Sequence, residues 1–353
     1  MYRRTLAVAL TLAYGIACSH ALAEPPVRAD DPRIARMGRT VAQADGSLRF
    51  AYPGVRLSLA FEGKALSVDA AASGGRSYIE VVVDGGAARI IRLSATPQAI
   101  GLVNARHAGV HRVDILHRSE SWHGVVTLAR FVTDGRLLAT PALPQRKMLV
   151  LGDSVTCGEA IDRVDGGEKD ASWWNPHVSY GMLAAQALGA QVHLVCHGGR
   201  GLVRSWNGRT DDDNLPDFYE LSIASESQPV RWDHAGYDPD LIVSAIGTND
   251  FSTGIPERAA YVKAYERLVR TLLRNHPHAQ IVLTEGAILS GERKAALAGY
   301  IAETIELTGS ARVHAAVSLH HPGDAADAHP TKAQHAAMAR ELVPQLRAVT
   351  GWE

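Results

Sequence analysis

Residues 148–156 read Met-Leu-Val-Leu-Gly-Asp-Ser-Val-Thr. The apolar run is typical of a buried β-strand, and the Gly-Asp-Ser that follows it ends the strand abruptly. A serine at the carboxyl end of such a strand lies at the rim of the sheet, where open α/β folds bind ligands. The backbone N–H of Ser154 could face a developing oxyanion, although an ordinary helix N-cap would explain the serine equally well. The residues downstream have to decide between these two interpretations.

After this stretch, short apolar runs alternate with helical patterns. The runs are continuous in Val, Ile and Leu, as expected for a parallel sheet that is covered on both faces. Residues 147–353 are therefore predicted to form an α/β domain. Its strands are expected at 147–151, 191–195, 240–246, 280–284 and 312–316, and its helices near 177–189, 257–275, 292–308 and 331–347.

The sequence before residue 139 has a different pattern. Between residues 33 and 138, short runs alternate apolar and polar residues and are separated by turn residues. One such turn, Asp84-Gly-Gly86, joins two β-type runs and is a strong hairpin signal. This pattern predicts an all-β, jelly-roll-like sandwich. Residues 139–146 contain two prolines and no periodicity, and are predicted to be a linker.

The first 23 residues have the features of a secretory signal peptide. Arg3 and Arg4 precede an apolar stretch, and Ala21-Leu-Ala23 offers small residues for cleavage. Cys18 raises a lipoprotein alternative, but the residues before it form a poor lipobox. We expect a secreted or periplasmic protein. A formal net charge of −1 without a basic run argues against nucleic acid or a membrane as partner.

Three polar motifs follow the predicted strands or precede the last helix. Acyl transfer by a serine needs a base and donors for the oxyanion, and these motifs offer both. Glycines after the second strand let the backbone approach a substrate, an asparagine amide after the third can donate, and a histidine before proline is held in a loop. The motifs are His197-Gly-Gly-Arg-Gly201, Gly247-Thr-Asn249-Asp250 and His329-Pro330. For Asp250 we favour a structural role.

In this order, the motifs resemble those of the SGNH (GDSL-type) hydrolases. Longer segments resemble carbohydrate esterase family 2, and together with the β-rich N-terminal half they extend the resemblance over nearly the whole chain after the leader. The segments are Gly152-Asp-Ser-Val-Thr-Cys-Gly158, 179–189, Gly199-Arg-Gly-Leu-Val-Arg204, 215–219 and Gly247-Thr-Asn-Asp-Phe-Ser252. The resemblance implies a three-layer α/β/α SGNH domain behind the sandwich. It also implies an exported acetyl esterase that acts on acetylated plant cell-wall polysaccharide or oligosaccharide, without a metal or organic cofactor.

The resemblance also implies roles for individual residues. Ser154 would be the nucleophile and His329 the general base and acid. The oxyanion would be bound by the Ser154 N–H, by the N–H of Gly199 or its rival Gly201, and by the side chain of Asn249.

One position departs from the family pattern. Many SGNH enzymes carry a carboxylate three residues before the histidine, where this chain has Ala326. We favour Asp327 as the orienting carboxylate. Asp324, or a backbone carbonyl in a Ser–His dyad, is the alternative.

Other residues have more general interpretations. Trp206 and Trp232 lie in loop-like stretches and could stack on sugar rings. Cys157 and Cys196 are expected to be buried free thiols, with a disulfide as the alternative. Two rival functions remain open: an SGNH arylesterase or lipase acting on small or lipid esters, and a carbohydrate-binding protein with a vestigial hydrolase domain. The oligomeric state, the sugar and the deacetylated hydroxyl are not predicted.

Overall fold

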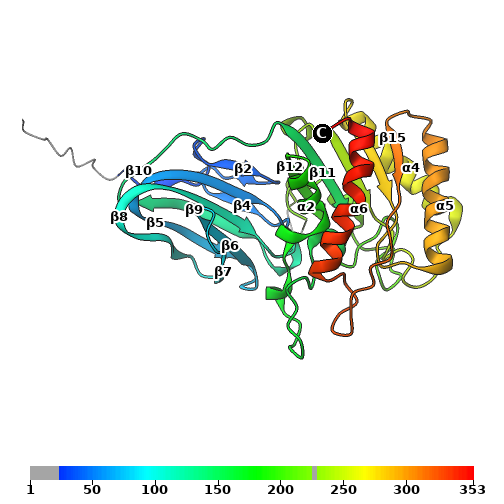
Figure 1. Cartoon of the computed structure of the whole chain (residues 1–353), viewed down its shortest axis with the longest axis horizontal. Coiled ribbons are helices and arrows are strands. Elements are labelled where there is room, and N and C mark those ends of the chain that lie inside the picture. Colours follow the sequence, from blue (N-terminus) through cyan, green and yellow to red (C-terminus); the bar gives the residue numbers. More distant parts are fainter. Residues whose placement is uncertain (1–23, 225–228) are drawn as a thin grey trace, which may run out of the picture.

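The computed structural model describes residues 24–224 and 229–353. A β-rich domain and an α/β domain lie end to end along the long axis of the molecule (Figure 1). The predicted signal peptide, residues 1–23, lies outside the described residues. Within the described ranges, no helix combines the length and the apolar character needed to cross a bilayer.

The N-terminal domain is a network of ten antiparallel strands. Its main path runs β3-β4-β9-β5-β8-β6-β7, while β1 pairs with β9, and both β2 and β10 pair with β5. The first strand begins at Val27. The sequence pattern placed the start of this domain later, at residue 33. The strands are β1 (Val27–Arg28), β2 (Ala35–Met37), β3 (Val41–Ala42), β4 (Leu48–Phe50), β5 (Arg56–Ala72), β6 (Tyr78–Val83), β7 (Arg89–Arg92), β8 (Gln98–His117), β9 (Val126–Thr133) and β10 (Arg136–Leu137).

Two long neighbouring strands lie in the middle of this network. β5 has 17 residues and β8 has 20, and their pairing shifts register near Gly63 and again near Leu66. Such irregularities bend a strand and increase its twist. The alternating residues Leu57, Leu59 and Phe61 are fully buried, which is the one-sided pattern that predicted an all-β sandwich. A short 3₁₀ helix, η1 (Ser121–His123), follows β8.

The C-terminal domain has the predicted three-layer α/β/α fold. Its five strands are all parallel, in the order β12-β11-β13-β14-β15. They are β11 (Arg146–Gly152), β12 (Ala190–Cys196), β13 (Leu241–Ala245), β14 (Gln280–Thr284) and β15 (Val313–Ala316). The helices are α1 (Ser154–Cys157), α2 (Tyr180–Ala187), α3 (Leu215–Phe218), α4 (Arg258–Asn275), α5 (Gly291–Thr308) and α6 (Lys332–Thr350), with 3₁₀ turns η2 (Ala171–Trp173), η3 (Pro176–Val178) and η4 (His234–Gly236).

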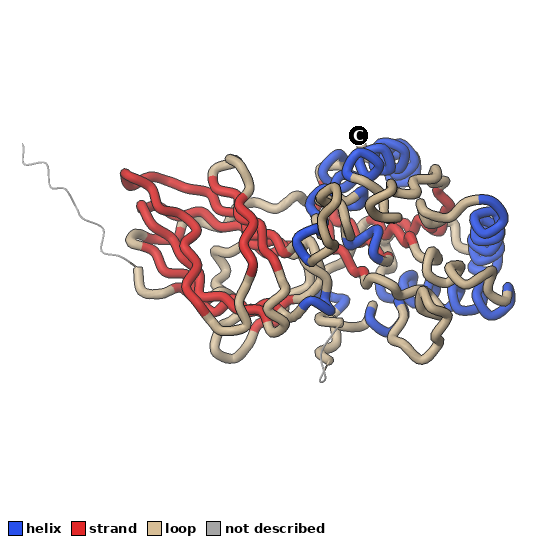
Figure 2. The backbone as a smooth tube through the Cα atoms, turned by 90° about the horizontal axis from the view of Figure 1, so that it is seen from below, coloured by secondary structure: helices blue, strands red, loops and turns tan. Residues whose placement is uncertain are grey.

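Helices cover both faces of the parallel sheet. On β11, Met148 and Val150 pack into the core that includes α2 and α6, whereas Leu149 and Leu151 join the core with α4 and α5. Because alternate residues of a strand point to opposite faces, a strand between two helical layers has to be apolar at every position. Figure 2 shows the helices gathered in this half of the molecule and the strands of the first domain in the other.

The two domains are packed against each other. The hydroxyl of Tyr52 donates to the carbonyl of Phe218 at 2.6 Å, and Arg39 donates to the carbonyls of Tyr219 and Leu221, both at 2.6 Å. One continuous cluster of buried apolar residues contains side chains from both domains. The N-terminal domain is therefore fixed against α3 and the residues that follow it.

Candidate active site

Ser154 is the first residue of α1 and follows strand β11 after one residue, Asp153. Because β11 lies between β12 and β13, this turn is the point at which the strand order reverses, where open α/β sheets bind ligands. Asp153 caps the helix by accepting a hydrogen bond from the Val155 N–H at 3.0 Å. A side chain at position 152 would collide with Thr156, so Gly152 lets the turn close tightly.

The fold brings Ser154 and His329 together from opposite ends of the domain. Oγ of Ser154 lies 2.9 Å from Nε2 of His329, and Nδ1 of His329 lies 2.6 Å from Oδ1 of Asp327. A carboxylate only accepts hydrogen bonds, so Nδ1 carries the proton and Nε2 accepts from the serine hydroxyl. The carboxylate of Asp324 points elsewhere, toward Arg163 at 2.8 Å. The three side chains have the arrangement of a Ser–His–Asp triad.

Charged groups around the imidazole set its proton affinity. Burial alone would lower the pKa of His329, but the hydrogen bond with Asp327 and the nearby Glu159 carboxylate raise it above the ordinary value, against a lowering effect of Lys169. Burial would raise the pKa of Asp327, yet hydrogen bonds from His329 and Lys169 hold it far below the usual range. Lys169 bridges Asp327, at 2.8 Å, and Glu159. Glu159 Oε2 lies 3.6 Å from Nε2 of His329.

Arg163 holds the loop that carries the histidine. Its Nη1 donates to the carbonyl of Asp327 and to the carboxylate of Asp324, both at 2.8 Å. Its Nη2 donates to the carbonyls of His329 and Pro330. The side chain is only 6 % exposed, so these contacts form in a shielded environment. Neither Arg163 nor Lys169 was singled out from the sequence.

The loop after β12 contains the two glycines that the sequence left as alternatives. The N–H of Gly201 donates to Oδ1 of Asn214 at 3.3 Å, and a Cβ on Gly201 would collide with the carboxylate of Asp250. That carboxylate accepts from the backbone N–H groups of residues 202–204, which is the structural role expected for it. The N–H of Gly199 has no hydrogen-bond partner among the described residues. Gly199, with a φ of +75°, is therefore the glycine with a free donor.

Asn249 provides a further donor from the loop after β13. One hydrogen of its Nδ2 is donated to the carbonyl of Arg200 at 2.8 Å, and the amide has a second hydrogen. The backbone N–H of Ser154 makes no hydrogen bond within the described ranges. Three donors, on Ser154, Gly199 and Asn249, are thus left free in the loops that follow β11, β12 and β13.

Cys157 and Cys196 form a disulfide, so the expectation of free thiols was wrong. Cys157 ends α1 and Cys196 ends β12, the strand beside β11. In the parallel pairing, Cys196 lies level with Gly152, which puts it next to the turn after β11. Adjacency of the two strands, which spacing in the sequence does not reveal, makes the bond possible. The disulfide joins the turn of Ser154 to the loop of Gly199.

A groove of about 330 Å³ opens beside the loop of Gly199. Two exposed tryptophans line it, Trp122 from the N-terminal domain and Trp206 from the C-terminal domain, with exposed fractions of 41 % and 62 %. Trp206 was singled out from the sequence, whereas Trp122 was missed. Trp232 is not among the residues that line this groove; its ring packs against the guanidinium of Arg39 at 5.0 Å.

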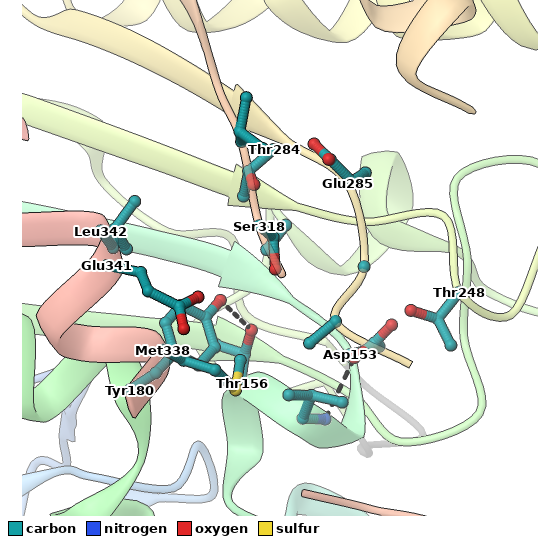
Figure 3. A pocket seen from close by; sticks show the side chains of 15 residues that line it. Asp153, Thr156, Tyr180, Thr248, Thr284, Glu285, Ser318, Met338, Glu341 and Leu342 are labelled. Atoms are coloured by element: carbon teal, nitrogen blue, oxygen red, sulfur yellow. Dashed lines mark hydrogen bonds between the residues drawn. The ribbon is translucent and has the colours of Figure 1, made fainter. Parts of the chain in front are cut away.

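A smaller cavity of about 30 Å³ lies beside Asp153, with Thr156, Tyr180 and Glu285 in its lining (Figure 3). Its size corresponds to about one water molecule. Oδ2 of Asp153 has no hydrogen-bond partner among the described atoms, and burial raises the pKa of this carboxyl to about 6. Asp153 and Val155, on either side of Ser154, line the cavity, whereas Ser154 and His329 do not.

Comparison with protein families assigns both domains. Residues 36–141 match the family model described as carbohydrate esterase 2 N-terminal. Residues 150–337 match the GDSL-like lipase/acylhydrolase family.

The chain is also similar to characterised proteins over nearly its full length. It is 58 % identical to an acetylxylan esterase / glucomannan deacetylase of Cellvibrio japonicus over 92 % of this chain and 91 % of that protein. The structure of a family two carbohydrate esterase from Cellvibrio japonicus matches with a TM-score of 0.92 and 58 % identity, over 93 % of this chain and 98 % of that one. One from Clostridium thermocellum, in complex with cellohexaose, matches with a TM-score of 0.85 and 28 % identity, over 91 % and 100 %. The chain belongs to carbohydrate esterase family 2, with an SGNH/GDSL-type hydrolase domain behind the family's N-terminal β domain.

Proposed function

We propose that this protein is an exported deacetylase that removes O-acetyl groups from xylan- or glucomannan-type polysaccharides and their oligosaccharides. The observation that carries the proposal is the hydrogen-bonded chain from Ser154 through His329 to Asp327. Free donors in the loops after β11, β12 and β13 support it. The activity of the Cellvibrio relative, an acetylxylan esterase / glucomannan deacetylase, supports the choice of substrate.

The geometry supports acylation of Ser154 as the first half of the reaction. Nε2 of His329 takes the hydroxyl proton while Oγ attacks the acetyl carbonyl. The tetrahedral oxyanion accepts hydrogen bonds from the N–H groups of Ser154 and Gly199 and from Nδ2 of Asn249. His329 then gives its proton to the departing sugar oxygen, which leaves an acetyl group on the serine and a free sugar hydroxyl.

Deacylation uses the same groups in reverse. Water replaces the sugar, His329 accepts a proton from it, and the hydroxide formed attacks the acetyl carbonyl. The oxyanion returns to the same three donors, and collapse releases acetate while the proton passes back to Ser154. Throughout both halves, Asp327 keeps the imidazole in one tautomer and stabilises its charged form.

The groove with Trp122 and Trp206 is the proposed site for the polysaccharide chain. Flat indole rings stack on the apolar faces of sugars, and both rings are exposed beside Gly199. The Clostridium relative forms a complex with cellohexaose, a β-linked glucan chain. We expect Trp206→Ala to raise KM for acetylated oligosaccharides and to leave KM for 4-nitrophenyl acetate unchanged.

The deciding experiment compares substrate classes with the purified full chain. Acetate release from acetylated xylan and glucomannan should exceed cleavage of long-chain nitrophenyl esters, and Ser154→Ala should abolish both. Preference for long acyl chains would favour the lipase alternative. Binding of polysaccharide without any acetate release would favour a carbohydrate-binding protein.

Export is part of the proposal. The signal-like leader lies in residues 1–23, and the Cys157–Cys196 disulfide is of a kind that persists in oxidising compartments. Fractionation of the producing cells tests this, because retention of the full-length chain in the cytoplasm would contradict it.

A further inference from the structure

A short segment of the N-terminal domain reaches the edge of the active site. It follows strand β8 and contains Glu120, whose side chain is completely buried. Oε1 of Glu120 accepts a hydrogen bond from the indole N–H of Trp174 at 2.7 Å, and Oε2 accepts one from the backbone N–H of Gly198. Both donors belong to the C-terminal domain, so the carboxylate bridges the domains.

The contact with Gly198 lies directly before the peptide that carries the Gly199 N–H. That peptide and the peptides on either side of it are each held by one hydrogen bond. Glu120 fixes the N–H of Gly198, Nδ1 of His197 donates to the carbonyl of Gly198 at 2.9 Å, and the N–H of Trp206 donates to the carbonyl of Gly199 at 2.9 Å. With these groups engaged, the N–H of Gly199 is the free donor of the turn.

Position 198 also has to be a glycine for this contact to form. A Cβ there would lie 2.8 Å from Oε1 and 2.9 Å from Oε2 of Glu120. The missing side chain thus makes room for the carboxylate against the backbone. The hydrogen bond to the Gly198 N–H and the space left by the absent side chain both show that Glu120 packs closely against this loop.

Burial of the Glu120 carboxylate is energetically unfavourable. Its hydrogen-bond partners on Trp174 and Gly198 are uncharged N–H groups, and burying an ionised carboxylate without a cationic partner costs free energy. Burial, together with repulsion from Glu159, raises the pKa of Glu120 to about 7 despite the N–H donors. Groups with such penalties concentrate at functional sites.

We propose that Glu120 is a positioning residue for the oxyanion-binding loop, supplied to the hydrolase domain by the β domain. It holds the Gly198 N–H away from the reacting carbonyl and thereby orients the Gly199 N–H toward the oxyanion. This rests on the proposed function, in which Gly199 binds the oxyanion. The β domain is then a component of the catalytic unit and does more than line the groove with Trp122.

The test is Glu120→Gln, assayed with 4-nitrophenyl acetate, a substrate too small to use the groove. A glutamine carbonyl can accept only at one end, and its NH₂ faces the other donor. We expect kcat to fall by roughly 10- to 100-fold, because small displacements of a catalytic group have effects of this size, while KM stays within about 2-fold. Binding of a small alkylboronic acid, which mimics the tetrahedral oxyanion on Ser154, should weaken in parallel with kcat.

A second variant and a control complete the design. Gly198→Ala places a methyl group against the Glu120 carboxylate and disturbs the same contact from the hydrolase domain. It should likewise lower kcat and leave KM nearly unchanged. Glu80→Gln is the matched control, because Glu80 is also a buried carboxylate of the β domain, paired with Arg118 at 2.8 Å and His177 at 2.9 Å, and does not contact the loop. It should keep kcat within about 2-fold of the parent.

Two outcomes would overturn the proposal: an unchanged kcat in folded Glu120→Gln, or a loss of kcat matched by Glu80→Gln. Failure of the proposed function would show differently, as activity retained in Ser154→Ala.

Discussion

The Asp327 carboxylate binds His329 twice through the same oxygen. Oδ1 accepts hydrogen bonds from the ring Nδ1 at 2.6 Å and from the backbone N–H at 2.8 Å. A residue two positions before the histidine therefore reaches the ring, because the loop turns back on itself. The second oxygen is occupied by Lys169 at 2.8 Å. These contacts fix both the tautomer and the orientation of the imidazole.

We expect Asp327→Asn to lower kcat by roughly 10⁴-fold, since the amide stabilises the wrong tautomer and leaves the imidazolium without a counter-charge. Asp324→Asn is the control on the same loop, because Asp324 binds Arg163 and does not touch the imidazole. It should stay within a few-fold of the parent. Steady-state hydrolysis of 4-nitrophenyl acetate measures both, and equal losses in the two variants would contradict the triad.

The acidic limb of the pH profile should lie above that of a free histidine. His329 has to be neutral to accept the serine proton, and its pKa is raised above the ordinary value of about 6.5. kcat/KM should therefore increase with pH through a midpoint above that value. A midpoint at or below the free value would be evidence against the counter-charges described here.

Two variants should move this limb in opposite directions. Glu159→Gln removes an anion that favours the imidazolium and should shift the limb to lower pH. Lys169→Met removes a cation that disfavours the imidazolium and should shift it to higher pH. Glu62→Gln, an exposed carboxylate of the β domain paired with Arg136, serves as the control and should leave the limb in place. A shift of both variants in one direction would show that structural damage dominates.

Arg163 should act on catalysis through the position of His329. Lysine has a single ammonium and cannot span the four carbonyls and one carboxylate that the planar guanidinium reaches. We expect Arg163→Lys to lower kcat by roughly 10- to 100-fold, with KM for a small ester nearly unchanged. Arg258→Lys, in an exposed ion pair with Glu303, is the control. An increase in KM alone would argue for substrate binding by Arg163.

Asn249 should contribute to the transition state and little to substrate binding. Removing one oxyanion donor typically costs about 10²- to 10³-fold in turnover, so Asn249→Ala should lose kcat by that amount. Asn275→Ala deletes a side-chain amide that contacts Tyr219, far along α4, and controls for loss of an asparagine. Near-normal turnover in folded Asn249→Ala would show that Asn249 does not bind the oxyanion.

The parallel sheet was predictable because strands buried on both faces produce a simple sequence pattern. Each of its five strands was placed to within one residue at either end, for example 147–151 against Arg146–Gly152. A strand covered on both faces has to be apolar at consecutive positions, and such runs are hard to mistake. Ser154 and Asn249 follow these strands, and His329 precedes the last helix. The topology therefore predicted that all three lie at the carboxyl edge of the parallel sheet.

Contacts between loops were not predictable in the same way. Arg163 meets the carbonyl of Asp327 across 164 positions, and Glu120 meets Gly198 across 78. These side chains lie in segments without periodicity, where charged residues are normally solvated. Arg163 finds its partners in a distant loop of its own domain, and Glu120 finds its partners only because the β domain packs against the hydrolase domain. The pairing of Cys157 with Cys196 depended in the same way on strand order.

The Cys157–Cys196 disulfide should stabilise the catalytic edge of the sheet. It closes a loop of 39 positions, and a bridge of that span commonly contributes roughly 2–4 kcal/mol, mainly by restricting the unfolded chain. Reduction by dithiothreitol should therefore lower the thermal midpoint of the protein by several degrees. The double variant Cys157→Ala/Cys196→Ala should show the same lower midpoint with or without the reductant, which separates the bond from other effects of the reagent. Free-thiol titration shows when reduction of the parent is complete. An unchanged thermal midpoint of the fully reduced parent would mean that the bridge adds nothing to stability. The pairing of β11 with β12, in which Gly152 lies opposite Cys196, would then hold this edge without it.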